Sequence, residues 1–235
     1  MGNRLFERLG AASGLAFVVL SLLSAFIYPQ QPRSDSPAAV TVAWVHNHRV
    51  ALQAGMIVAL FAAGALLWFA AYLRDTLADR ADNGPSLSTL VFGGGIAVAI
   101  MSALAAMPTA LLAFMDAQPA GISDPALVRM LGDLNTVFFS ANSAMTVVFL
   151  LALGLAMLRG ALASTWLGWL TLVVVGFNGV AVWVGVTFSS YHGKAWNAVG
   201  WGAFIGFLAI ILITSISRLT RSAAAAPPPS MAAVS

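Results

Sequence analysis

Six long apolar segments dominate the sequence and decide what this chain can fold into. They cover about residues 10–28, 51–73, 87–115, 130–158, 163–188 and 195–217. A helix needs about 20 predominantly apolar residues to cross the hydrocarbon core of a bilayer, and each segment reaches about that length. The sequence therefore predicts an all-α integral membrane bundle with six transmembrane helices at residues 10–217. It also predicts a cytoplasmic N-terminus at 1–9 and a disordered cytoplasmic tail at 218–235, which is rich in alanine and proline.

Composition and missing motifs exclude several classes of protein. Hydrophobic residues make up 60% of the chain and charged residues only 8%. The net charge is +3, but the basic residues stand singly, so no nucleic-acid surface is predicted. The absence of cysteine excludes thiolate metal sites and cysteine nucleophiles. There is also no zincin, serine-hydrolase, Walker or dinucleotide motif, so no cofactor is predicted.

The distribution of basic residues predicts the orientation of the chain in the membrane. Short cytoplasmic loops carry an excess of lysine and arginine. With a cytoplasmic N-terminus, seven basic residues lie inside and four outside: Arg4, Arg8, Arg74, Arg80, Arg159, Arg218 and Arg221 against Arg33, Arg49, Arg129 and Lys194. The sequence therefore predicts a multi-pass protein of the inner (plasma) membrane with both termini in the cytoplasm.

Two local signals indicate irregular or closely packed helices. Ser36 and Pro37 are a typical N-cap and first helical residue, which predicts a short outer helix leading into the second span. In the third span, the triple glycine at 93–95 and Pro108 weaken the backbone hydrogen bonds, and a kink is expected at Pro108. The four-residue glycine spacings, Gly10 with Gly14 and Gly202 with Gly206, are typical of close helix packing, within one chain or in a dimer.

The fourth span begins with the unusually polar stretch GDLNTVFFSANSAM, residues 132–145. On a helical wheel with about 100° per residue, its polar side chains fall into two stripes. One holds Thr136, Ser140 and Ser143, and the other holds Asn135, Asn142 and Thr146. An apolar sector lies between about 40° and 140° from Asp133. Because unpaired amides are costly in hydrocarbon, this helix is predicted to lie at the centre of the bundle.

The polar residues of the fourth span have two interpretations. In one, Asn142, together with Asn178 of the fifth span, joins helices through side-chain hydrogen bonds. In the other, Asp133, Asn135, Ser140, Asn142 and Asn178 line a polar cavity for a ligand or a transported molecule. Asp133, counted as about one turn into the helix from Arg129, is expected to complement the positive helix end.

Histidine and carboxylate side chains gather at the predicted outer end. They are His46, His48 and His192 with Asp116, Asp124 and Asp133. Such side chains bind zinc, iron or copper. His46 and His48, however, are separated by about 200° on a helix and cannot share one ion there. No metal site is therefore predicted, although the three histidines are its only weak candidates.

Several segments together resemble a known family. In order they are SPAAVTVAWVHNHRVALQAG, LLWFAAYLRDTL, FGGG, DPALVRMLGDLNTVFF and STWLGWLTL. Over about residues 5–217 the chain resembles six-span bacterial membrane proteins of the domain-of-unknown-function 4386 type, although Ser164 stands where that family often has proline. The resemblance implies a six-helix membrane protein. It carries no agreed activity, so it assigns a role to no residue.

The function predicted from the sequence is non-enzymatic. We expect an accessory or interaction protein in contact with membrane lipid, which binds a small apolar or lipid ligand and has a protein partner or a second copy of itself. A small-molecule or ion transporter with a polar cavity on the fourth span is the alternative. A metal-dependent membrane enzyme with the outer histidines ranks below both.

Overall fold

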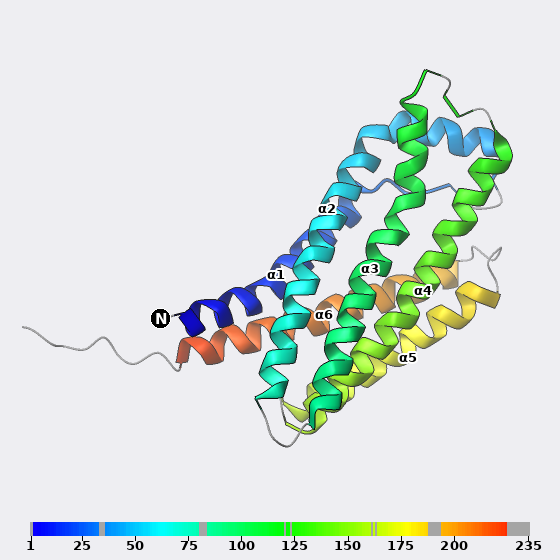
Figure 1. Cartoon of the computed structure of the whole chain (residues 1–235). Helices are drawn as coiled ribbons and strands as arrows, with labels where there is room; N and C mark the ends of the chain where they lie inside the picture. The colour runs from blue at the N-terminus through cyan, green and yellow to red at the C-terminus, as the bar shows by residue number, and fades with distance from the viewer. Residues whose placement is uncertain are drawn as a thin grey trace, which may run out of the picture.

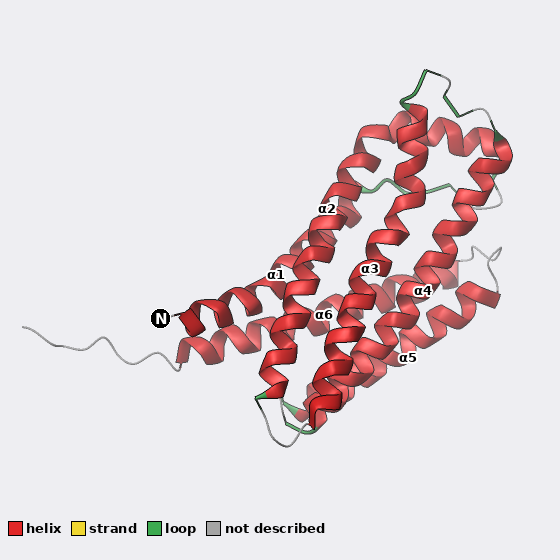
Figure 2. Cartoon of the chain, viewed as in Figure 1, coloured by secondary structure: helices red, strands yellow, loops and turns green. Residues whose placement is uncertain are grey.

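Six helices make up almost all of the described structure, a computed structural model that covers residues 2–32, 36–79, 84–119, 121–122, 124–160, 162, 164–187 and 194–224. The helices are α1 Gly2–Ile27, α2 Ala38–Ala78, α3 Gly84–Asp116, α4 Pro125–Leu158, α5 Thr165–Thr187 and α6 Lys194–Ala224. No strand occurs in these ranges (Figure 2). Each helix contains a stretch long and apolar enough to cross a bilayer. The prediction of an all-α bundle with six membrane-spanning helices is confirmed.

The helices form a ring in chain order. Each helix packs against the next one in the sequence, and α6 returns to α1. Figure 1 shows α2, α3 and α4 side by side, with α1, α6 and α5 crossing behind them. The start of α1 and the end of α6 lie at the same end of the bundle, as an even number of spans requires. We call the opposite end, which carries the α3–α4 connection, the distal end.

Two apolar clusters hold the ring together. The main core lies toward the end with the termini and draws residues from all six helices. At its centre the ring of Phe207 makes edge contacts with Phe17 and Phe149, with centroids 5.6 and 6.2 Å apart. The distal cluster is smaller and joins only α2, α3 and α4, through Trp44, Val45, Leu52, Leu112, Ala113, Val128 and Leu131. The distal end is therefore held by three helices and the main core by six.

Glycine lets several helix pairs approach closely. A Cβ on Gly10 would meet the Tyr72 ring of α2, and one on Gly14 would meet both Phe69 and Ser215. A Cβ on Gly206 would lie 3.1 Å from Val174 of α5, whereas Gly202 has more space. The predicted close packing at Gly10, Gly14 and Gly206 thus occurs within this chain. Dimerisation through these pairs stays a prediction.

The helix α2 is longer than a membrane span. Its 41 residues correspond to about 60 Å at 1.5 Å per residue, twice the hydrocarbon thickness of about 30 Å. Figure 1 shows its first turns lying across the distal ends of α3 and α4. We call residues 38–49 the arm. The predicted short helix leading into the second span is present, but as a continuous part of α2.

Three predicted details of the helix ends are wrong. Pro37 occupies the N-cap of α2 and no side chain caps that end, so Ser36 is not the cap. The helix α6 continues to Ala224, so residues 218–224 are helical, and residues 225–235 lie outside the described part. The third detail concerns α4, which begins at Pro125 after an Asp124 N-cap. This start places Asp133 beyond the second turn, where a helix dipole no longer acts on it.

The helix α4 is the most buried span, with 44% of its most apolar stretch inside the bundle. It packs between α3 and α5 and also touches α2. One side nevertheless remains exposed, through Val137, Val148, Leu151 and Leu155. Two of these residues, Val137 and Val148, belong to the predicted apolar sector. The prediction of a central helix is therefore right about burial and wrong about enclosure, because a ring of six helices leaves each helix an outer side.

Candidate functional site

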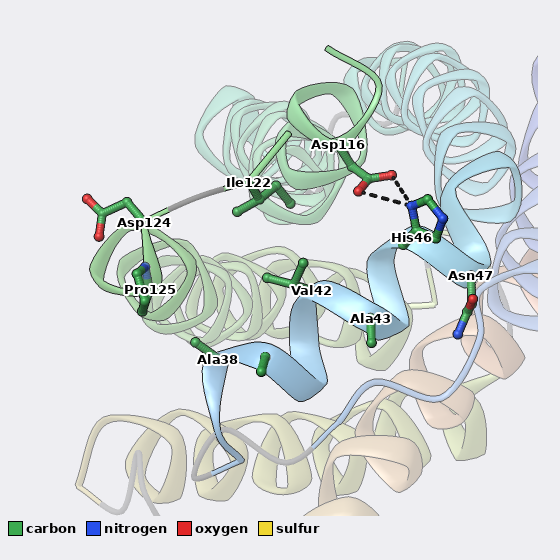
Figure 3. Close-up of a pocket in the computed structure, with 10 residues that line it drawn as sticks. Ala38, Val42, Ala43, His46, Asn47, Asp116, Ile122, Asp124 and Pro125 are labelled. Carbon is green, nitrogen blue, oxygen red and sulfur yellow. Dashed lines mark hydrogen bonds and ion pairs between the residues drawn. The ribbon is translucent and has the colours of Figure 1, made fainter. Parts of the chain in front are cut away.

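A pocket lies between the arm and the distal ends of α3 and α4. Its volume is about 500 Å³, and we call it the distal pocket. The arm contributes one helical face, and the α3–α4 connection contributes the facing wall (Figure 3). The lining residues are Ala38, Ala39, Val42, Ala43, His46, Asn47, Asp116, Ile122, Asp124 and Pro125. Pockets of this size are typical of small-molecule sites in proteins.

Local sequence signals explain both walls of the distal pocket. On the arm, Ala38, Val42 and His46 follow each other at four-residue spacing and therefore share one face. On the other wall, the side chain of Asp124 accepts a hydrogen bond from the backbone N–H of Ala126 at 2.8 Å. Pro125 follows in the first turn, where its missing N–H costs nothing. This capped start fixes the direction in which α4 leaves the pocket.

The distal cluster holds the arm in place. Trp44 and Val45 are buried there against residues of α3 and α4, and the pocket residues Val42 and Ile122 pack at its edge. Burial of a large apolar side chain contributes about 1.5–3 kcal/mol, so Trp44 is a principal anchor of the arm. The floor of the pocket is therefore packed, while its mouth is open to the outside of the bundle.

Asp116 supplies the main charge of the pocket. Its side chain is only 8% exposed. The Nδ1 atom of His46 lies 3.4 Å from Oδ1 and 3.3 Å from Oδ2, and Arg49 Nη1 lies 3.9 Å from Oδ2. Figure 3 shows the carboxylate facing the His46 ring across the top of the pocket. His46 and Arg49 are themselves 71% and 41% exposed, so the buried carboxylate has only long contacts with two exposed side chains.

Buried polar atoms without a hydrogen bond gather at the distal end. In the described part of the chain they are Tyr28 Oη, Trp44 Nε1 and Asp116 Oδ2. Burial raises the pKa of Tyr28, an effect that the nearby Thr109 hydroxyl opposes. Because buried polar groups in proteins are usually paired, these atoms show that polar groups at the distal end are incompletely satisfied.

The structure places Asn135 and Asn142 against α3. The side-chain amide of Asn135 is buried and donates to the Ala105 carbonyl at 2.8 Å. The hydroxyl of Ser102 donates to Asn142 Oδ1 at 3.1 Å. Both asparagines therefore join α4 to α3, in agreement with the interpretation of this stripe as a contact between helices.

The other three candidates on the spans either form hydrogen bonds within their own helices or lie exposed. Asn178 is buried, but its amide donates to Val174 O of its own helix at 3.0 Å, so this hydrogen bond does not join two helices as the first interpretation expects. Ser140 is buried and donates to Thr136 O, also within its helix. Asp133 lies exposed on the surface of α4. None of these five residues lines the distal pocket.

The described histidines have separate partners. His46 pairs with Asp116, whereas His48 Nδ1 donates to the Trp44 carbonyl at 2.8 Å and its ring lies against Trp44. The arm is helical, so the two rings diverge as the spacing predicts. His192 lies outside the described residues. Among the residues that the structure describes, no three histidine or acidic side chains are close enough to hold a metal ion.

The distal pocket was not predicted from the sequence. The sequence places His46, Asp116 and Asp124 at one end of the bundle, but only the fold brings Asp116 under the arm. Two signals could have indicated it: the small residues at four-residue spacing along the arm and the Asp124–Pro125 helix start. No family model, curated protein or solved structure matches this chain. The resemblance to the 4386-type family therefore stays a prediction.

Proposed function

We propose that this chain is a non-enzymatic accessory or interaction protein of the membrane, whose distal pocket binds a small apolar or lipid ligand. The observation that carries the proposal is the lining of the pocket. Val42, Ile122 and the arm alanines offer an apolar wall, and Asp116 offers a buried charge at one end of it. A mostly apolar pocket with one or two placed polar groups is the usual form of a ligand site.

The two alternatives have less support. A transport pathway along α4 would need free polar groups at membrane depth, yet Asn135 and Asn142 already bind α3. A metal-dependent enzyme would need several ligands around one ion, whereas His46 and His48 turn to different partners. The carboxylate–imidazole pair also has no hydroxyl or thiol nucleophile among the residues lining the pocket.

We also propose that both termini are cytoplasmic and that the membrane is the bacterial inner membrane. The seven-to-four division of basic residues supports this orientation. The distal pocket then opens at the outer interface, where lipid headgroups and dissolved molecules both reach it. A ligand with an apolar body and a polar head suits such a position.

The test of ligand binding uses native mass spectrometry on the full chain extracted gently from its membrane. We expect a retained small molecule or lipid on the unchanged protein and on Val40→Trp. We expect its loss in Val42→Trp, because residue 42 lines the pocket and residue 40 on the same arm does not. Val40 is 48% exposed, so an indole there is tolerated and controls for the added bulk.

Two results would overturn the proposal. One is a bound species that survives unchanged in Val42→Trp, which would place it elsewhere on the bundle. The other is the absence of any bound species from all three proteins. Size-exclusion profiles confirm that each variant remains a folded, homogeneous particle before the spectra are compared.

A further inference from the structure

The charge of the residues that line the distal pocket indicates the chemical class of the ligand's polar head. The volume of the pocket does not. Two carboxylates line the pocket, those of Asp116 and Asp124. No lysine or arginine is among the ten lining residues, and the one imidazole belongs to the exposed His46. The lining is therefore acidic, in a chain whose net charge is +3.

Asp116 has unused capacity as an acceptor. An ionised carboxylate offers about four lone-pair sites. In the structure it has one long contact with His46 at each oxygen and Arg49 at 3.9 Å, and Oδ2 accepts no well-aligned hydrogen bond. Charge-assisted hydrogen bonds are normally about 2.7–2.9 Å long. Burying a carboxylate to this degree costs free energy unless a close donor reaches it. Binding of a cationic donor in the pocket is therefore favourable.

The remaining walls limit the shape of that cation. Val42, Ile122 and Pro125 border the pocket with apolar surface (Figure 3). Asp124 stands at the opposite edge from Asp116 and uses Oδ1 to cap α4. The two carboxylates lie on different edges, and among the described residues no three histidine or acidic side chains are close enough to hold a metal ion. The set therefore suits a compact organic cation better than a metal ion.

We propose that the distal pocket binds its ligand through a primary ammonium group held against Asp116, with a short alkyl body on the wall of Val42 and Ile122. The inference rests on the proposed function and names the chemistry of the same site. An ammonium group has three donors, and Asp116 has only the long contacts of His46 and Arg49 in their place. Two sources carry this group at a membrane surface: an ethanolamine phospholipid and a free alkylamine.

The test compares three probes of equal chain length on the full protein in phosphatidylglycerol nanodiscs. They are octylamine, octanol and octanoate, measured by isothermal titration. We expect octylamine to bind about tenfold more tightly than octanol, which corresponds to one decade in Kd, and octanoate to bind most weakly. Asp116→Asn should remove this preference with little change in octanol binding.

Matched variants keep the result interpretable. Asp133→Asn removes an exposed carboxylate in the first half of α4. It should leave the affinities for octylamine, octanol and octanoate unchanged. Asp124→Asn keeps a good N-cap and removes the rim charge, so a smaller loss, about two- to threefold, is expected for octylamine. If Asp116→Asn disturbs the arm, Asp124→Asn still tests the role of charge.

The outcomes separate this inference from the proposed function. Equal binding of octylamine and octanol, lost together in Val42→Trp, would overturn the ammonium inference and leave the pocket proposal standing. Binding that Val42→Trp does not affect would overturn both. Native spectra from nanodiscs with and without phosphatidylethanolamine then identify the source. A retained ethanolamine lipid supports the lipid, and retained affinity for octylamine alone supports the free amine.

Discussion

Asn135 of α4 binds α3 in the turn that precedes Pro108. Proline lacks the N–H that would bind the carbonyl four residues earlier, and its ring crowds the preceding turn. Ala105 lies in that turn, and its carbonyl accepts the Asn135 amide at 2.8 Å. Proline is tolerated in membrane helices when a neighbouring helix satisfies the freed backbone groups. The carbonyl that Pro108 frees is that of Leu104, whereas Asn135 binds the next carbonyl, so we interpret Asn135 as a contact between α3 and α4. This contact explains a buried amide without a transport role.

Replacing Asn135 tests this interpretation at the scale of one residue. We expect Asn135→Leu to lower the free energy of unfolding by about 1–2 kcal/mol, because it removes a buried hydrogen bond between α4 and α3. Asn142→Leu should cost less, since the Ser102 hydroxyl can turn to a carbonyl of its own helix. Unfolding in mixed detergent measures both variants.

The proline provides the control for this prediction. Alanine at residue 108 restores a donor for the Leu104 carbonyl and not for the Ala105 carbonyl, so Asn135→Leu should cost about the same in a Pro108→Ala background. A clearly smaller cost in the Pro108→Ala background would contradict this and show that Asn135 compensates for the proline.

At the scale of an element, the triple glycine of α3 serves packing more than bending. A Cβ on Gly94 would lie 2.9 Å from the Cα atom of Phe149, and one on Gly95 would meet Ala70. A Cβ on Gly93 would meet nothing within 4 Å. Gly94 and Gly95 therefore let α4 and α2 approach α3, while Gly93 faces open space and has no packing role.

Alanine substitutions should separate these adjacent glycines. Gly94→Ala is expected to lower the melting temperature of the detergent-solubilised protein, because backbone atoms of α4 must move away. Gly93→Ala should leave it unchanged or raise it, since alanine favours a helix by about 1 kcal/mol over glycine. A similar loss in both variants would contradict the packing role and favour a general need for flexibility.

At the scale of the whole molecule, the orientation in the membrane can be tested with single cysteines. The chain has no cysteine of its own, so the unchanged protein is a blank. With cytoplasmic termini, a membrane-impermeant maleimide should label Val40→Cys, which is exposed on the arm and does not line the pocket, in intact spheroplasts. It should label Ser230→Cys in the tail only after permeabilisation. The reverse pattern would invert the proposed topology.

The arrangement of the whole chain also explains the position of the pocket. The polar contacts at Ser102, Ala105, Asn135 and Asn142 lie between the main core and the distal cluster along α3 and α4. Beyond them only three helices pack together, and the arm crosses their ends. This sparse distal end leaves room for a pocket that the six-helix core does not.

The sequence by itself determined the class of the protein, its six spans and the polar character of α4. Each of these depends on the length or periodicity of one segment, and hydrophobic burial in a bilayer acts on that segment alone. The tertiary structure decided which polar groups meet. Asn135 could have faced any neighbour, and Asp116 became a buried charge only because the arm folds over the end of α3. Such pairings depend on the rotation and register of two helices, which no single segment specifies.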